Sequence, residues 1–174
     1  YCTTNFGTNN TINLTGNNRA DKVLVVTGKG INLTNLEELN ITTAKVELGT
    51  NSEVVIGGSL ELNAVRVSKT TGTAGNHIHK GLEINSPTGK TIAIDNCVFE
   101  YGIKGLTKTT SSSLTQLVIE NTTFTNCSLG LKTNECRCNL VNVRFDNCVT
   151  GWKAEAMSGS SDFRGYVQSV DNGI

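Results

Sequence analysis

Acidic and basic side chains recur at fixed positions in the second half of the chain, where they could form a site for acid–base chemistry. Asp95 and Glu120 occupy equivalent positions of a repeated segment, and Lys132 and Lys153 share another position. Two carboxyl groups about 5 to 9 Å apart can cleave a glycosidic bond, and a cation that neutralises a uronate carboxylate makes the neighbouring proton acidic. Outward positions of any soluble repeat protein are polar, so the same residues also fit a solvated face without chemistry.

The segment "NHIHK" holds both histidines of the chain, His77 and His79. On one side of an extended segment they could offer two imidazoles to a metal ion. No third ligand stands nearby in sequence, and an exposed insert with incidental histidines is the alternative that we favour. The insert is the longest interruption of the strand pattern, and such loops often carry binding surfaces.

Six cysteines are present, but their spacing does not indicate a metal site. No CxxC motif occurs, and "CRC" lacks the spacing of a zinc knuckle. Cys127 and Cys148 are repeat equivalents, so stacking of neighbouring units would bring them within the range of a disulfide. Free cysteines also fill small apolar ladders well, so both states stay open.

A repeated unit must position these groups. Each of three segments has an Asn, an aromatic residue three positions later and a Gly six positions after that: Asn96, Phe99, Gly105; Asn121, Phe124, Gly130; Asn142, Phe145, Gly151. Alternating apolar residues precede each Asn, which predicts strands with one buried face. The Asn should turn a sharp corner in the left-handed conformation and hydrogen bond along its column, and the Gly should turn a second corner.

The pattern apolar-x-apolar-x-Asn-x-x-Phe-x-Asn-Cys-x-x-Gly-Leu resembles the parallel β-helix repeat of the pectate-lyase-like superfamily. The resemblance covers Thr91 to Lys153 well and is weaker earlier. It implies one all-β domain over residues 1–174: a single-stranded right-handed parallel β-helix of about six or seven coils, with three short strands each. Residues 1–90 should form less regular coils and residues 91–174 the regular repeats. Family enzymes use calcium, a Lys or Arg base, or paired Asp residues, on the outer face of one sheet.

The composition excludes some classes of function. Asn and Thr make up roughly a quarter of the chain, a balance typical of turns and strands. A net charge of zero argues against nucleic acid as a partner, and no apolar run reaches the ~20 residues of a membrane span. The first residue is Tyr1, which suggests a processed mature protein or a trimmed one.

The C-terminal segment predicts an uncovered end. Gly173 and Ile174 fall where the Gly-Leu corner of a further coil would begin. We therefore expect a longer parent protein, or end-to-end or edge self-association with Phe163, Tyr166 and Val167 near the contact.

Two functions remain from the sequence. The first is a secreted or surface-exposed non-catalytic module, an adhesin-like rod that binds a polysaccharide or cell-surface glycan and needs no cofactor. The second is a polysaccharide lyase or glycoside hydrolase that uses the Asp95/Glu120 and Lys132/Lys153 columns, with calcium as its cofactor if it needs one. We favour the first, because the charges are few and scattered. Ice binding is disfavoured, since no Thr-x-Thr motif recurs at the coil period.

Overall fold

The structure is a computed structural model that describes the backbone of residues 2–3, 10–85, 89–109, 115–134, 136–155 and 162–170. Side chains are described in the same ranges except 2–3 and 162–170. All regular elements of these residues are strands, and none of the described residues forms a helix that could cross a membrane.

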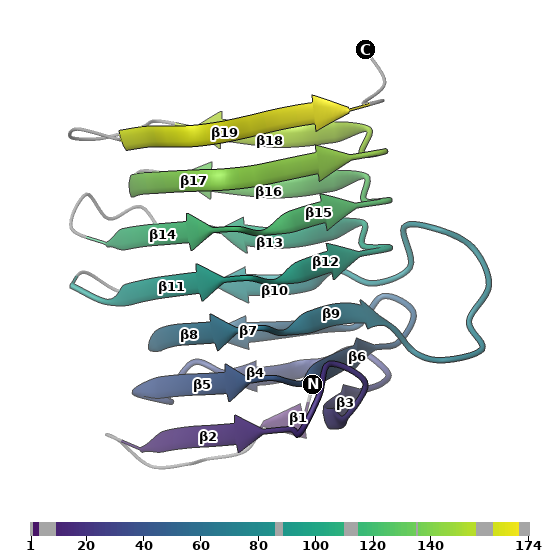
Figure 1. Cartoon of the computed structure of the whole chain (residues 1–174). Helices are drawn as coiled ribbons and strands as arrows, with labels where there is room; N and C mark the ends of the chain where they lie inside the picture. The colour runs from purple at the N-terminus through teal and green to yellow at the C-terminus, as the bar shows by residue number, and fades with distance from the viewer. Residues whose placement is uncertain are drawn as a thin grey trace.

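The strands stack into a parallel β-solenoid of about six turns (Figure 1). Each turn contributes one strand to each of three walls. The first wall contains β2 (Thr11–Thr15), β5 (Glu38–Thr42), β8 (Ser59–Asn63), β11 (Thr91–Asp95), β14 (Gln116–Glu120) and the first half of β17 (Arg137–Asp146). The second wall contains β3 (Lys22–Val26), β6 (Lys45–Leu48), β9 (Arg66–Lys69), β12 (Val98–Glu100), β15 (Thr123–Thr125) and the second half of β17. The third wall contains β1 (Cys2–Thr3), β4 (Ile31–Leu33), β7 (Glu53–Ile56), β10 (Gly81–Ile84), β13 (Lys104–Lys108), β16 (Leu129–Asn134) and β18 (Thr150–Glu155).

The predicted fold class is confirmed: the protein is all-β, with parallel strands and three strands per coil. The first corner of each coil joins the first and second walls, the second corner joins the second and third walls, and the third corner leads into the next coil. The irregular first half of the chain follows the same course, with its longest insert, between β9 and β10, projecting at the right of Figure 1.

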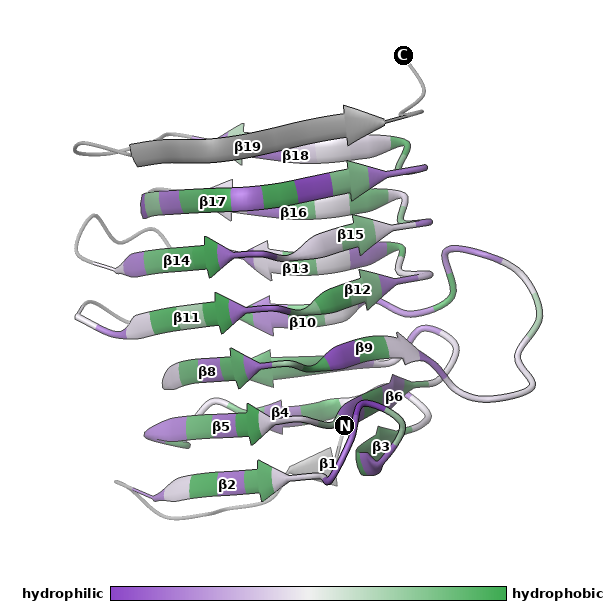
Figure 2. Cartoon of the chain, viewed as in Figure 1, coloured by the Kyte–Doolittle hydropathy of each residue, from purple (hydrophilic) through white to green (hydrophobic). Residues whose placement is uncertain are grey.

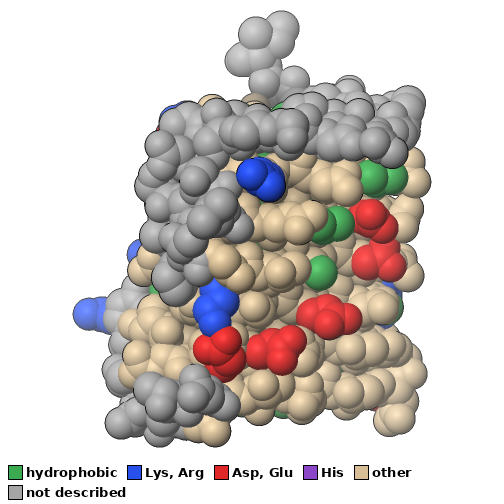
Figure 3. Space-filling view, turned by 90° about the vertical axis from the view of Figure 1, so that its left-hand side faces the viewer, with side chains coloured by type: hydrophobic (Ala, Val, Ile, Leu, Met, Phe, Trp, Pro, Cys, Tyr) green, Lys and Arg blue, Asp and Glu red, His purple; other side chains and the backbone are tan. Residues whose placement is uncertain are grey.

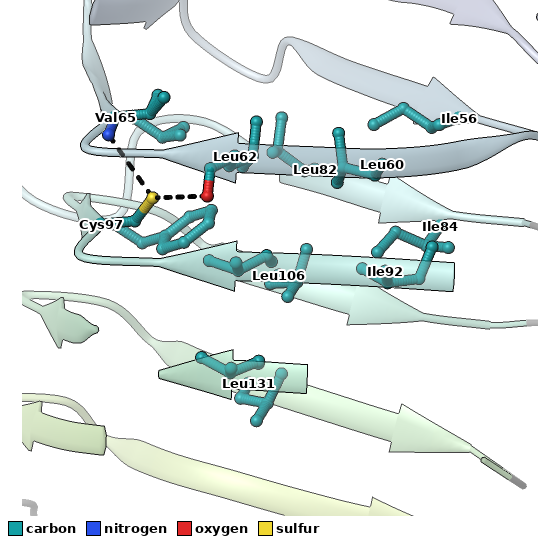
Figure 4. Packing of buried hydrophobic residues seen from close by; sticks show 14 of the residues in the cluster. Ile56, Leu60, Leu62, Val65, Leu82, Ile84, Ile92, Cys97, Leu106 and Leu131 are labelled. Carbon is teal, nitrogen blue, oxygen red and sulfur yellow. Dashed lines mark hydrogen bonds between the residues drawn. The ribbon is translucent and has the colours of Figure 1, made fainter. Parts of the chain in front are cut away.

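Burial alternates along the strands of the first wall, whereas β7 and β13 of the third wall are buried at nearly every residue. Figure 2 shows green and purple bands alternating along β17, whose burial alternates in the same way. Leucine, isoleucine and valine from all three walls meet inside. The labelled side chains of Figure 4 show this packing for the first and third walls and the first corner. Because like positions of successive coils are about 4.8 Å apart, each apolar side chain covers its equivalent in the next coil.

The predicted aromatic stack is confirmed. Phe99, Phe124 and Phe145 are aligned in register, and their ring centroids lie 4.9 and 5.3 Å apart with interplanar angles of 14° and 18°. All three side chains are buried. The parallel column of Leu106, Leu131 and Trp152 is also in register. These two columns fix the alignment of the regular coils.

The Asn column turns the first corner as predicted. Asn96, Asn121 and Asn142 have left-handed φ values of 53°, 47° and 53°. Asn142 Nδ2 donates to Asn121 Oδ1 at 3.0 Å, and Asn121 Nδ2 donates to Asp95 Oδ1 at 2.9 Å. The column therefore supplies both the backbone conformation of the corner and a ladder of hydrogen bonds between coils.

The glycines do not turn the second corner, and this part of the prediction is wrong. Gly105, Gly130 and Gly151 lie within β13, β16 and β18 and lack a left-handed φ. A Cβ on Gly130 would lie 2.7 Å from the Gly151 carbonyl oxygen and 3.0 Å from the Phe145 ring. Glycine is needed at these positions because the aromatic stack and the neighbouring backbone occupy the space of a side chain.

The second corner is turned by other residues. Tyr101, Asn126 and Asn147 have φ values of 65°, 53° and 49° there. Asn147 Nδ2 donates to Asn126 Oδ1 at 2.6 Å, which forms a second, shorter Asn ladder.

The C-terminal segment continues the solenoid. Strand β19 (Asp162–Val170) pairs in parallel along β17, and its residues Phe163 and Val167 are aligned with Leu140 and Val143. The expectation of an uncovered end is therefore wrong for β17, whose edge pairs with β19. Self-association stays a prediction, and the side chains of Phe163, Tyr166 and Val167 lie outside the described residues.

Candidate functional site

The carboxylates of Asp95 and Glu120 stand side by side on the outer face of the first wall. They are aligned in register between β11 and β14, one strand spacing apart, as the repeat predicts. Acidic side chains are visible on this face, with apolar ones beside them (Figure 3); the aligned neighbours Ala93 and Val118 lie two residues before the carboxylates. Asp95 accepts the hydrogen bond from Asn121, so one of its oxygens is already engaged in the corner ladder.

Lys132 and Lys153 lie on the third wall and not beside those carboxylates. They are aligned in β16 and β18, and both bind Glu155, at 2.9 and 3.0 Å. Hydrogen bonds from Lys132 and Lys153 lower the pKa of Glu155. The structure therefore brings together the members of each column but separates the acidic column from the basic one.

The outer face of the second wall carries buried ion pairs that the sequence analysis missed. Glu47 is bound by Lys45 at 2.7 Å and by Lys22 at 3.1 Å. Burial acts to raise the pKa of Glu47, but hydrogen bonds from Lys45, Thr71 and Lys22 outweigh it and lower the pKa to about 2. A carboxylate held ionised in this way cannot serve as a general acid near neutral pH.

Glu100 is the second buried carboxylate of this wall. Its Oε1 accepts hydrogen bonds from Arg66 at 2.7 Å and from Ser68 at 2.6 Å. Both buried acidic side chains of the second wall thus stabilise contacts between coils. The alternation of charge in "KVEL" was the available signal for Glu47.

His79 is part of the second corner and is fully buried, so the expectation of an exposed histidine is wrong for this residue. Its Nε2 lies 2.9 Å from the Glu100 carbonyl oxygen, and burial lowers its pKa. The ring occupies space that Gly102 of the next coil leaves open, since a Cβ on Gly102 would lie 3.2 Å from His79 Cε1.

His77 is half-buried and has a left-handed φ of 56°. Among the described residues no three His, Cys, Asp or Glu side chains form a group that could hold a metal ion.

The five cysteines whose side chains are described are buried, and no disulfide joins them. Cys127 and Cys148 stack at the second corner and hydrogen bond to one another; the hydrogen bond from Cys127 lowers the pKa of Cys148 to about 7. Cys97 accepts the Val65 N–H at 3.4 Å and contacts the Leu62 carbonyl oxygen (Figure 4). Burial raises the pKa of Cys97 to about 11, which makes it an inert core residue.

A surface that the sequence did not indicate lies where the third wall begins. Lys29 precedes β4, Lys80 precedes β10 and Lys104 begins β13; we call these three lysines the basic edge. Within the described part of the chain none of them forms an ion pair, whereas most other lysines do. Glu53, which begins β7 on the same edge, is more than nine-tenths buried.

Two lysines of the basic edge, Lys29 and Lys80, border an open hollow of about 550 Å³, and Lys104 lies outside its lining. Its lining consists of Gly28, Lys29, Thr50, Asn51 and Lys80. Lysine ammonium groups, a hydroxyl and an amide are donors suited to sulfate, phosphate or carboxylate groups and to sugar hydroxyls. The hollow can therefore hold an anionic polar ligand, and its described lining residues include no carboxyl pair for bond cleavage.

Comparison with protein families, with characterised proteins and with solved structures finds no match to this chain. The function is accordingly argued from the geometry.

Proposed function

We propose that the chain is a non-catalytic β-solenoid module that binds an acidic glycan through the basic edge. The observation that carries this proposal is the gathering of Lys29, Lys80 and Lys104, three lysines without an ion pair among the described residues, beside an open polar hollow. Uronate or sulfate groups spaced along a polysaccharide would meet successive lysines along this edge of the solenoid.

The rest of the architecture supports a binding role. The parallel walls hold the edge rigid, so little conformational entropy is lost when a ligand binds. Elsewhere, buried carboxylates and their cationic partners are used to join coils, as Glu47 and Glu100 show. Within this proposal the protein acts outside the cell or at its surface, where such glycans occur, and belongs with the pectate-lyase-like β-helices that its repeat resembles.

Polysaccharide cleavage is the second candidate, and the register of Asp95 with Glu120 favours it. Neighbouring carboxyl groups about 5 Å apart are typical of retaining glycosidases. Product formation from neutral and acidic polysaccharides, with and without calcium, tests this candidate. Activity that survives in the double variant Asp95→Asn/Glu120→Gln would remove these two residues from consideration.

The binding proposal is tested by titrating the chain with sulfated and uronate oligosaccharides and with a neutral oligosaccharide of equal length. The variant Lys80→Gln/Lys104→Gln should bind the acidic ligands at least tenfold more weakly. The matched control Lys132→Gln/Lys153→Gln loses the same charge from the same wall and should change affinity less than twofold. Binding should also weaken steeply as salt rises, because exposed charges are screened within about 8 Å at physiological ionic strength. Equal losses in both variants, or equal affinity for the neutral ligand, would contradict the proposal.

A further inference from the structure

Two cysteines with touching sulfur atoms lie at the third corner. Cys136 comes just before β17, and Cys138 is the second residue of that strand. Their Sγ atoms are 3.3 Å apart, and the residues are 0% and 2% exposed. The two residues are separated by one position, so both side chains point to the same side of the extended chain, into the core. The pair needs only a small approach to reach the ~2.05 Å of a disulfide.

A buried lysine lies near this pair. Lys108 is fully buried on β13, aligned with Ile84 of the preceding coil and on the same side of the strand as the core residue Leu106. Burial lowers the pKa of Lys108, and the nearby sulfurs of Cys136 and Cys138 oppose this effect. The positive charge of Lys108 in turn favours a thiolate at the pair.

The two sulfurs are not equivalent. The hydrogen bond from Cys138 and the positive charge of Lys108 lower the pKa of Cys136, although burial opposes them. The hydrogen bond with Cys136, burial and the nearby Cys136 charge raise the pKa of Cys138. These opposite shifts favour Cys136 over Cys138 as the thiolate of the pair.

We propose that Cys136, Cys138 and Lys108 form a redox site in which a hydroperoxide converts the two thiols into a reversible disulfide. The Cys136 thiolate attacks one oxygen of hydrogen peroxide, the O–O bond breaks and hydroxide leaves, which gives a sulfenic acid at Cys136. The Cys138 sulfur then attacks the Cys136 sulfur, and the S–O bond breaks as the disulfide forms. The hydroxide and the departing oxygen take up the available protons, so two thiols and one peroxide yield one disulfide and two waters.

The class of oxidant follows from burial. Neither sulfur is open to solvent, so a molecule the size of peroxide can enter through small fluctuations of the corner, whereas a bulky aromatic disulfide requires a larger opening. This site is separate from the basic edge and does not depend on glycan binding.

The test treats the reduced 174-residue chain with hydrogen peroxide, then alkylates the remaining thiols after denaturation and digests the chain with trypsin. Trypsin cuts after Arg137, so a Cys136–Cys138 disulfide joins peptide 133–137 to peptide 138–144 in the mass spectrum. We expect this link to form first, while Cys97 stays reduced, and to disappear with dithiothreitol. 5,5'-Dithiobis(2-nitrobenzoate), a bulky aromatic disulfide, should react with the native pair at least tenfold more slowly than with the denatured chain.

Variants separate the roles of the three residues. Cys138→Ser should leave a sulfenic acid at Cys136 that a dione probe labels. Lys108→Met removes the charge and should slow oxidation about tenfold, the effect of a pKa rise of one unit on the thiolate fraction, whereas Lys108→Arg should keep most of the rate. Circular dichroism checks that each variant is folded.

Several outcomes would overturn the proposal. One is a chain in which Cys97 or the Cys127–Cys148 pair oxidises while Cys136 and Cys138 remain alkylatable. Another is an unchanged rate in folded Lys108→Met, which would remove the lysine from the site. Native thiols that react with the bulky disulfide as fast as denatured ones would refute the argument from burial.

Discussion

Replacing Phe124 by alanine should cost more stability than any comparable change on the surface of the solenoid. Phe124 is fully buried and stacks on an aromatic ring on both sides, at centroid distances of 4.9 and 5.3 Å. Buried Phe→Ala changes cost about 3 to 5 kcal/mol, and each ring pair adds about 0.5 to 1.5 kcal/mol beyond the area it buries. Because the neighbouring coils also pack on one another through Leu131, they cannot collapse fully into the space. The upper half of the range, about 4 to 5 kcal/mol, is therefore expected.

The assay is urea unfolding followed by circular dichroism, with thermal unfolding beside it. For a domain of this size 1 kcal/mol corresponds to about 2 to 4 °C, so the melting temperature of Phe124→Ala should fall by roughly 8 to 20 °C. Phe124→Leu keeps most of the volume and should lose less than half as much. Val25→Ala, at a side chain that is 51% exposed, is the surface control and should change stability by less than about 0.5 kcal/mol. A loss below about 1 kcal/mol in Phe124→Ala would refute the stacked register.

Three further changes test the corners and the second wall. Asn121→Val should lower the free energy of unfolding by about 2 to 3 kcal/mol in urea unfolding, because it forces a branched residue into a left-handed φ and removes ladder hydrogen bonds. Asn121→Gly should lower it by about half as much. Equal losses in the two variants would contradict this account. Gly130→Ala should lower the free energy of unfolding by about 1 to 3 kcal/mol through overpacking, and Gly130→Asn should lower it more. If Gly130→Asn were instead more stable than Gly130→Ala, residue 130 would lie at a left-handed corner. The pKa of Glu47 falls from 4.5 to about 2 on folding, so its stabilisation is complete above pH 4.5 and is lost as the pH falls toward 2. Glu47→Gln should therefore be less stable at pH 7 and lose less stability over that acid range, which unfolding midpoints at several pH values can measure.

The sequence predicts the regular coils well because their like residues stack on one another. Once Phe99, Phe124 and Phe145 are aligned, the parallel fold fixes the register of everything between them, and the Asn column follows. The second corner could not be assigned in the same way. Asn and Gly both tolerate the left-handed conformation, so "TNCSLGL" offers two residues for one corner. Only the packing between coils, where the Gly151 carbonyl oxygen and the Phe145 ring approach Gly130, shows that Gly130 is required for space.

The less regular first half limited the prediction of the site. Lys29, Lys80 and Lys104 are far apart in sequence, and the insert between β9 and β10 removes any fixed period that would connect them. Their proximity depends on the number of complete coils between them. The burial of His79 could not be predicted for a related reason, because it depends on the absence of a side chain at Gly102 in the following coil.

The net charge of zero also concealed the basic edge. Net charge describes the whole chain, whereas screened electrostatic interactions act locally. The 15 basic residues balance the 15 acidic ones in number, but not in place. Asp95 and Glu120 lie on the outer face of the first wall, while the basic edge lies at the second corner, the vertex opposite that wall in a three-walled coil. Over a Debye length of about 8 Å at physiological ionic strength, an anion at the basic edge experiences chiefly the lysines nearest to it. A neutral composition therefore argues against a long polyanion that contacts the whole surface, such as nucleic acid, and remains compatible with an acidic glycan bound along one edge.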